Sequence, residues 1–169
     1  DLINITEAVK NGDIDDIIGR DKEMTEIIKV LSRRKKNNVV IVGDGGVGKT
    51  AIVYGLAKRI LEEKVPSAMM KKEIVMLNIM ALISGTNLRG MFEERVNELF
   101  TELGNTDKYI LFIDDIHTVL KGSRDKDSDI SGMIGDVLAG GNVKVISTTT
   151  FKEYRNTIAS NTSICRKLQ

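Results

Sequence analysis

The stretch from Val39 to Thr50 constrains the fold of this chain more than any other. Four apolar residues are followed by a G-x-x-x-x-G-K-T pattern, and a helical pattern comes next. In this setting the pattern predicts a phosphate-binding loop between a strand and a helix, because glycines let backbone N–H groups curl toward phosphate oxygens. The predicted nucleotide contacts are Asp44, Gly45, Gly46, Val47, Gly48, Lys49 and Thr50.

Two side chains of this loop have chemical tasks beyond the turn itself. The Lys49 ammonium can reach β- and γ-phosphates, and the Thr50 hydroxyl can ligate Mg²⁺. The helix that starts near Lys49 adds its positive dipole end at the same point. The alternative is a glycine-rich turn that only joins a strand to a helix. That alternative gives no packing reason for Lys followed by Thr at this offset.

The bulk composition excludes several classes of protein. The 169 residues suffice for one domain with a real core. Lys and Arg number 25 and Asp and Glu 24, a net charge of +1 that argues against a large nucleic-acid footprint. The single cysteine, Cys165, cannot form an internal disulfide, and no apolar run reaches membrane-spanning length. We therefore expect no nucleic-acid or membrane partner, and a cytoplasmic location, or an organelle stroma or matrix in a eukaryote.

Strand and helix patterns alternate along the chain. Apolar residues at the i, i+3, i+4, i+7 spacing, such as Met24, Ile27, Ile28 and Leu31, predict an amphipathic helix over residues 21–35. Further helices are predicted over residues 50–61, 91–103, 130–138 and 151–158, and strands over 39–42, 74–79, 109–113 and 143–147. Such alternation is typical of a parallel sheet covered on both faces. The predicted fold is thus a three-layer α/β sandwich.

A pair of acids follows the third predicted strand. Residues 110–113 are apolar, and Asp114 and Asp115 come next. The carboxyl ends of parallel strands form the edge where ligands of open α/β sheets bind. Asp114 could hold Mg²⁺ through its water shell, and Asp115 could orient and polarise an attacking water. The alternative is a pair of solvated acids that merely ends a strand.

The fourth predicted strand ends in hydroxyl groups, from Ser147 to Thr150. Such a strand can offer a polar contact near the γ-phosphate, but threonine is also common in strands. His117, the only histidine, lacks Cys, His or acid partners at metal-ligand spacing and is interpreted as a residue at a helix start.

The order of these motifs resembles the AAA+ ATPases, and the finer match is to the first ATPase module of the Clp family of protein unfoldases and disaggregases. The phosphate loop alone indicates only nucleotide binding. The segments Gly-Thr-x-x-Arg-Gly-x-Phe-Glu-x-Arg and Glu-Tyr-Arg are far narrower signals. The resemblance is carried by residues 17–20, 33–38, 43–52, 85–95, 110–117 and 149–155.

The resemblance implies roles at matching positions. Ile17 and Ile18 would line an adenine pocket, with ordinary core packing as the alternative. Thr150 corresponds to the sensor threonine that monitors the γ-phosphate. Arg166 corresponds to the arginine finger that reaches a neighbouring subunit's nucleotide, with a plain surface arginine as the alternative. The loop that grips polypeptide in the ring's central pore would include Thr86, Asn87, Leu88 and Arg89.

The chain departs from the family pattern at four places. Asp115 stands where the family usually has Glu, which is longer by one C–C bond, about 1.5 Å. Leu88 occupies a pore-loop position that is usually aromatic, and Lys167 stands where a second Arg is common. These three departures bear on the rate of hydrolysis and on substrate grip rather than on nucleotide binding. The fourth is Asn38-Val39 in place of Asn-Pro.

Residues 1–169 are therefore expected to form the large subdomain of one AAA+ module, with residues 1–18 leading into the adenine pocket. The family's fifth strand would follow Gln169, and its helical lid would follow that strand. The expected function is ATP hydrolysis, slow in this fragment alone, that drives threading of polypeptides through a homo-hexameric ring, with a protease as a possible partner. One alternative is a regulatory or structural ring subunit that binds nucleotide but hydrolyses it weakly. Another is an AAA+ ATPase acting on nucleic acid.

Overall fold

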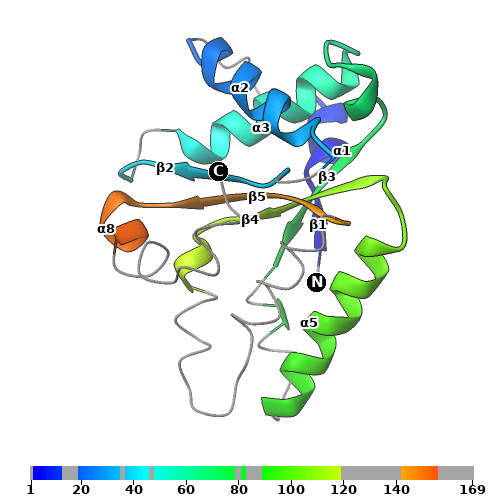
Figure 1. The fold of residues 1–169 in the computed structure, drawn as a ribbon, viewed down its shortest axis with the longest axis vertical. Helices are drawn as coiled ribbons and strands as arrows, with labels where there is room; N and C mark the ends of the chain where they lie inside the picture. The colour runs from blue at the N-terminus through cyan, green and yellow to red at the C-terminus, as the bar shows by residue number, and fades with distance from the viewer. Residues whose placement is uncertain are drawn as a thin grey trace.

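A twisted central sheet divides the molecule into two layers of helices (Figure 1). The structure is a computed structural model, and it describes residues 2–12, 19–34, 37–45, 48–78, 81–82, 89–118 and 142–155. The predicted helix over residues 130–138 lies outside these ranges. None of the described helices is long and apolar enough to cross a membrane.

Four strands of the sheet run parallel, as the alternation of elements predicts. They are β2 (Val39–Val42), β3 (Glu73–Leu77), β4 (Tyr109–Ile113) and β5 (Lys144–Thr149). A fifth strand, β1 (Leu2–Asn4), pairs antiparallel with β3 and was not predicted, because three residues carry no periodicity. The spatial order is β1-β3-β4-β5-β2. The α/β sandwich is thus confirmed, with one antiparallel edge strand added.

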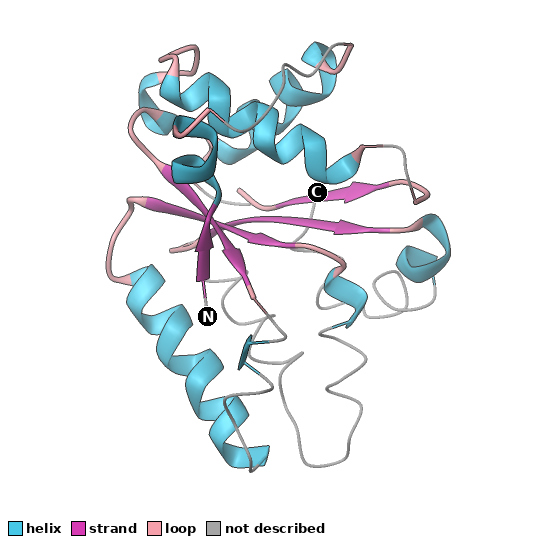
Figure 2. Ribbon diagram, turned by 180° about the vertical axis from the view of Figure 1, so that it is seen from behind, coloured by secondary structure: helices cyan, strands magenta, loops and turns pink. Residues whose placement is uncertain are grey.

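The middle strand β4 packs against both helical layers. Ile110 and Phe112 belong to the core cluster under α1 (Ile5–Lys10), α2 (Asp21–Leu31) and α3 (Lys49–Leu61). Leu111 and Ile113 belong to the cluster under α5 (Arg89–Gly104). All four side chains are at most 1% exposed. Side chains that alternate between two covered faces make a continuous apolar run, so residues 110–113 of β4 include no polar residue. Figure 2 shows these two layers from behind.

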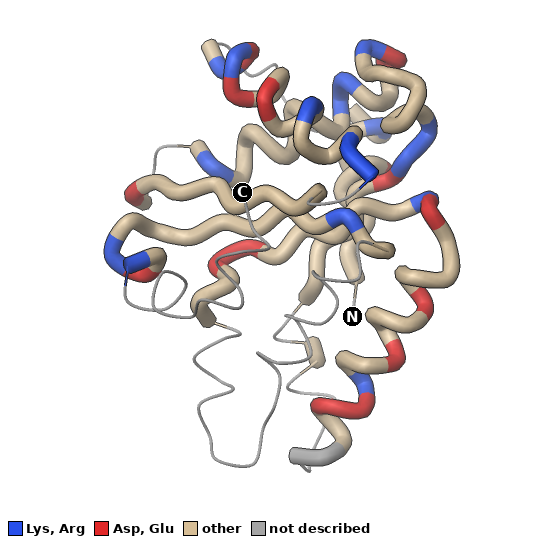
Figure 3. Tube along the Cα trace, viewed as in Figure 1, with Lys and Arg blue, Asp and Glu red and all other residues tan. Residues whose placement is uncertain are grey.

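Charge is excluded from the middle of the sheet. In the described strands the only charged residues are Glu73 and Lys144, each the first residue of its strand. Figure 3 shows charged residues gathered instead on the outer helices and in the connections. This distribution agrees with burial on both faces, because an unpaired charge within the sheet would lose its hydration.

The helix predicted over residues 21–35 ends earlier, at Leu31. Ser32 is the C-cap, and its N–H still donates to the Ile28 carbonyl. The Lys144 ammonium donates to the carbonyls of Leu31 and Arg33. A cation at a helix C-terminus is favourable because it complements the helix dipole. The partly buried ammonium loses hydration and lies near Lys72, and both effects lower the pKa of Lys144.

Two further short helical elements are part of the described fold. They are the 3₁₀ turn η1 (Ser67–Met69) and α8 (Phe151–Glu153). The predicted helix from residue 151 is confirmed over these three residues, and residues 156–158 lie outside the described ranges. Because β2, β4 and β5 are parallel and adjacent, their carboxyl ends share one edge of the sheet. In open α/β sheets that edge is where ligands bind.

Candidate nucleotide-binding site

The glycine-rich loop joins β2 to α3, as predicted. The Gly43 N–H donates to the Thr149 carbonyl at 3.1 Å, which ties the start of the loop to the end of β5. Gly48 is the N-cap of α3 and has φ +87, in the left-handed region. A Cβ at Gly48 would meet nothing closer than the Ala51 Cβ at 3.9 Å. The position therefore needs glycine for its backbone conformation rather than for space.

The Lys49 side chain folds back over the glycine-rich loop that precedes it. Its ammonium donates to the Gly43 carbonyl at 2.6 Å and to the Asp44 carbonyl at 3.1 Å. Lys49 is also the first residue of α3, where N–H groups without helical partners face outward. A positive charge and a helix N-terminus therefore meet at one point, which favours a phosphate anion.

The two acids leave the end of β4 with different surroundings. Asp114 is half-buried, and its Oδ1 accepts a hydrogen bond from the Thr148 hydroxyl at 2.5 Å. Asp115 is exposed, and its N–H donates to the same hydroxyl oxygen at 2.9 Å. The exposed carboxylate is thus free to meet solvent, while the half-buried one is oriented by β5.

The backbone at Asp115 is left-handed, with φ +49. Non-glycine residues adopt this region at a cost, and Asp and Asn tolerate it better than most. The Asp115 carbonyl accepts from the Thr118 N–H at 2.8 Å, so the turn is closed on both sides of the residue. The motif predicted that Asp115 follows the strand but not this conformation.

Thr150 lies just beyond β5 as the N-cap of α8. Its Oγ1 accepts from the Glu153 N–H at 3.1 Å, and its carbonyl accepts from the Tyr154 N–H at 2.8 Å. A hydroxyl that accepts a bond from an N–H keeps its own proton to donate. The capping role therefore leaves Thr150 able to donate to a phosphate oxygen, as the sensor assignment requires.

Three polar contacts between the segment that follows β4 and the end of β5 were not assigned from the sequence. The Thr148 hydroxyl joins both acids, and His117 Nδ1 lies 3.0 Å from the Thr149 hydroxyl oxygen. The β4–β5 register pairs Ile113 with Ser147, and Asp114 and Thr148 are the next residues of the two segments. The run of hydroxyls was visible in the sequence, but the partner of each hydroxyl depends on this register.

The oxygen donors at this edge suit Mg²⁺ bound mainly through water and phosphate. Thr50 lies in the first turn of α3, and Asp114 keeps Oδ2 outside its bond to Thr148. Among the described residues, no three His, Cys, Asp or Glu side chains cluster as a metal site. Mg²⁺ usually takes one or two protein ligands and completes its shell with water and phosphate oxygens, so this sparse set fits.

Nine predicted site residues remain, and the structure describes the backbone of one of them. Arg89 is the first residue of α5, and its side chain is not described. The others lie outside the described residues: Ile17, Ile18, Gly46, Val47, Thr86, Asn87, Leu88 and Arg166. Their assignments stay predictions.

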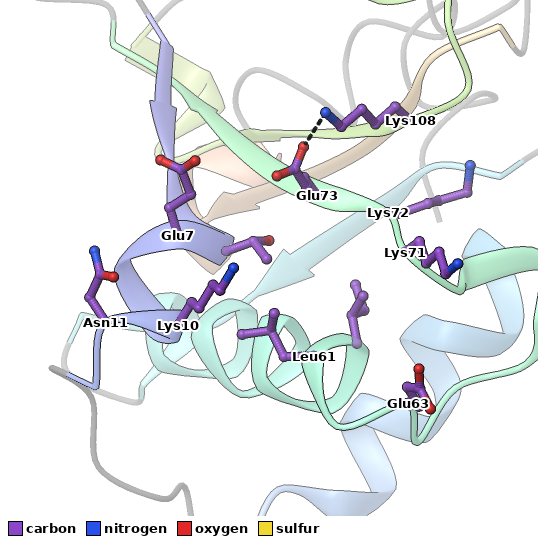
Figure 4. Close-up of a pocket in the computed structure, with 11 residues that line it drawn as sticks. Glu7, Lys10, Asn11, Leu61, Glu63, Lys71, Lys72, Glu73 and Lys108 are labelled. Atoms are coloured by element: carbon purple, nitrogen blue, oxygen red, sulfur yellow. Dashed lines mark ion pairs between the residues drawn. The ribbon is translucent and has the colours of Figure 1, made fainter.

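A separate polar pocket of about 580 Å³ lies at the opposite edge of the sheet (Figure 4). Glu73 begins β3 and Lys108 precedes β4, so this pocket is at the amino ends of the parallel strands. The Lys108 ammonium pairs with Glu73 at 3.0 Å, and this contact raises the pKa of Lys108. Four lysines and three glutamates line the pocket, so its formal charge nearly cancels. It is not part of the phosphate site.

The fold and this edge define a nucleotide-binding α/β protein of the phosphate-loop class. The family described as the ATPase family associated with various cellular activities (AAA) matches residues 39–159. The chain belongs to this AAA family of ATPases. Within it, the resemblance to the Clp-type chaperones is confirmed by the relatives described next.

The relatives are ATP-binding subunits and chaperones of the Clp group. The chain is 41% identical over 169 residues to the ATP-dependent Clp protease ATP-binding subunit ClpE of Lactococcus lactis subsp. lactis, covering 99% of this chain and 22% of that protein. It is 42% identical over 168 residues to the chaperone protein ClpB of Aquifex aeolicus, covering 99% and 17%. The chain thus spans about a fifth of the length of these relatives.

Solved structures of the S. cerevisiae protein Hsp104 have the same fold. The Saccharomyces cerevisiae Hsp104–ADP complex matches with a TM-score of 0.87 at 35% identity, over 99% of this chain and 29% of that one. The extended S. cerevisiae Hsp104–casein complex matches with a TM-score of 0.88 at the same identity and coverage.

Proposed function

We propose that this chain is the ATP-binding and ATP-hydrolysing module of a ring-forming, Clp-type protein unfoldase. One observation carries the proposal. The phosphate loop, the acid pair and the hydroxyl-ended strand meet at one sheet edge, in the order β4-β5-β2. Hydrogen bonds from Gly43 to Thr149 and from Thr148 to Asp114 tie these three strand ends together.

Phosphate binding follows from the loop and the start of α3. The loop N–H groups and the α3 N-terminus attract the phosphate oxygens, and Lys49 exchanges its two carbonyl contacts for the β- and γ-phosphates. Thr50 and Asp114 would hold Mg²⁺ between them and the phosphates. When bound, Mg²⁺ neutralises negative charge on the β- and γ-phosphate oxygens.

Hydrolysis requires water to attack the γ-phosphorus in line with the bond that breaks. Asp115 is exposed at this edge, so its carboxylate can orient the water and take up its proton. The bond to the bridging oxygen then breaks, and ADP and phosphate leave. The Thr150 hydroxyl keeps a proton for a γ-phosphate oxygen. Arg166 of a neighbouring subunit would supply a further cation, as the family resemblance implies.

The wider activity of the full-length protein is proposed from its relatives. The solved Hsp104 structures include a casein complex, and ClpE carries the name of a protease ATP-binding subunit. By analogy, this protein forms a homo-hexameric ring, threads polypeptides past the loop of residues 86–89, and can feed a protease.

A second candidate function is a ring subunit that binds ATP but hydrolyses it poorly. The short side chain at Asp115 and its left-handed backbone favour this candidate, because reach and direction decide whether a carboxylate contacts the attacking water. Steady-state ATP turnover by the full-length protein separates the two candidates.

Nucleotide binding is tested most simply at Lys49. Lys49→Ala removes the ammonium that contacts the loop, so we expect affinity for a non-hydrolysable ATP analogue to fall by at least about tenfold, the worth of one charged hydrogen bond. Isothermal titration of the full-length protein measures this. Lys22→Ala, on the exposed side of α2, is the matched control and should bind as the wild type does. Equal affinity in both variants would contradict the assignment of the loop.

A further inference from the structure

Thr148 occupies an unusual position for a strand residue. Its side chain is fully buried, at 0% exposure, yet it lies between the two acids of the candidate site. Its hydroxyl donates to Asp114 Oδ1 at 2.5 Å and accepts from the Asp115 N–H at 2.9 Å. One hydroxyl therefore uses both its donor and an acceptor position on neighbouring residues with different proposed tasks.

The bond to Asp115 acts on the backbone of that residue. Asp115 has φ +49, a conformation that L-residues rarely adopt without support. The N–H bond to Thr148 and the carbonyl bond from Thr118 hold the residue in this conformation. Because φ sets the direction of the Cα–Cβ bond, the bond from Thr148 helps to aim the Asp115 carboxylate.

The bond to Asp114 acts on the carboxylate itself. A donor on Oδ1 fixes the rotation of the carboxylate plane and leaves Oδ2 to face a metal or its water shell. The Thr148 hydroxyl thus supports both Asp114, which would hold Mg²⁺, and Asp115, which would orient the attacking water. Thr150 has a separate role, since its hydroxyl caps α8.

We propose that Thr148 is a positioning residue for ATP hydrolysis, one that sets the geometry of both carboxylates without touching nucleotide. The proposal rests on the proposed function of this site. It predicts that loss of the Thr148 hydroxyl impairs turnover much more than nucleotide binding, because the phosphate loop and Lys49 make no hydrogen bond to Thr148 among the described residues.

The test compares Thr148→Val with Thr148→Ser in the full-length protein. Valine keeps the shape and removes the hydroxyl, whereas serine keeps the hydroxyl and removes a methyl group. Thr148→Ala repeats the loss of the hydroxyl with a smaller side chain, in case the valine variant folds poorly. The first readout needs no nucleotide: hydrogen–deuterium exchange by mass spectrometry over residues 110–118. We expect faster exchange in Thr148→Val and Thr148→Ala, and exchange like the wild type in Thr148→Ser.

The second readout separates turnover from binding. We expect kcat to fall between about 10-fold and 10²-fold in Thr148→Val, the scale of a small misplacement of catalytic groups. The Kd for an ATP analogue should change by less than about twofold, and Thr148→Ser should keep most of the wild-type kcat.

Exchange in Thr148→Val equal to the wild type would overturn the proposal, as would a fall in kcat that only parallels a loss of nucleotide affinity. A serine variant as impaired as valine would also overturn it, since shape rather than the hydroxyl would then matter. A wild-type protein that binds ATP without turnover contradicts the proposed function and the catalytic part of this proposal. The exchange readout still decides, in that case, whether Thr148 holds the turn at Asp115.

Discussion

Both the short side chain of Asp115 and its left-handed backbone decide where its carboxylate lies. The residue has φ +49, where Asp and Asn are tolerated better than longer side chains. By sequence alone, Asp115 is a shortened version of the Glu that the family usually has at this position. In the structure, the left-handed backbone also redirects the side chain. Side-chain reach and backbone direction must therefore be considered together.

A longer acid at this position is expected to separate the two effects. Asp115→Glu restores about 1.5 Å of reach, so we expect a higher ATP turnover in the full-length protein. It also places a less suitable residue in the left-handed region, at a cost of about 1 kcal/mol, so we expect a lower unfolding temperature. Phosphate release and a thermal melt measure the two quantities. A lower turnover would mean instead that the backbone here is adapted to aspartate.

The residues of the site were predictable to different extents. Lys49, Asp114 and Asp115 follow from local motifs, because each lies next to the strand or loop that positions it. The role of Thr148 was not predictable, since it depends on a register between residues 34 positions apart. The capping bond of Thr150 is local, since it joins Thr150 to Glu153. Thr150 can cap α8 only because β5 ends at Thr149, and the strand predicted from the sequence ended two residues earlier.

At the scale of elements, buried polar side chains join segments that are distant in sequence. The Thr6 hydroxyl of α1 accepts from the Ile74 N–H of β3 at 2.8 Å, and the side-chain Oδ1 of Asn38 accepts from the Val145 N–H of β5 at 3.0 Å. Both polar side chains are at most 5% exposed. Each satisfies a backbone N–H at the start of a strand, where the sheet itself provides no acceptor.

Removing one of these bonds should destabilise the fold. Thr6→Val keeps the shape of the side chain but leaves the buried Ile74 N–H without its acceptor, at an expected cost of about 1–3 kcal/mol. Denaturant unfolding followed by circular dichroism measures the loss. Thr101→Val is the matched control, because Thr101 bonds to its own helix on an exposed surface. If both variants lose the same free energy of unfolding, the buried Thr6 bond stabilises the fold no more than the exposed Thr101 bond does.

The elements that sequence reasoning predicted are those with a sufficiently long periodic pattern. The limits of β2 and β4 were predicted to the residue, because each is an apolar run bounded by polar residues or by the glycine-rich loop. The elements β1 and α1 were missed. They have three and six residues, and tertiary contacts such as the Thr6 bond hold them in place. The end of α2 also carries a tertiary contact that no local pattern predicts, the hydrogen bond from the Lys144 ammonium to the Leu31 carbonyl.

At the scale of the whole molecule, the two ends of the parallel strands differ in chemical character. The carboxyl ends of the strands carry the phosphate loop and the two acids, whereas the amino ends carry a polar pocket with nearly balanced charge. The overall α/β class could be predicted because strand and helix patterns alternate. The antiparallel position of β1 could not, since it depends on pairing with β3 across about seventy residues.

The central claim is that this sheet edge hydrolyses ATP in the assembled protein. The most direct measurement is steady-state ATP turnover by the full-length protein and its Asp115→Asn variant, with analogue affinity measured for both. Asparagine tolerates the left-handed backbone and keeps the N–H bond to Thr148, so it removes only the charge and basicity of the carboxylate. We predict measurable wild-type turnover, a fall of about 10²–10⁴-fold in the variant, and unchanged affinity. Tight ATP binding without wild-type turnover, or equal turnover in both proteins, would contradict this account.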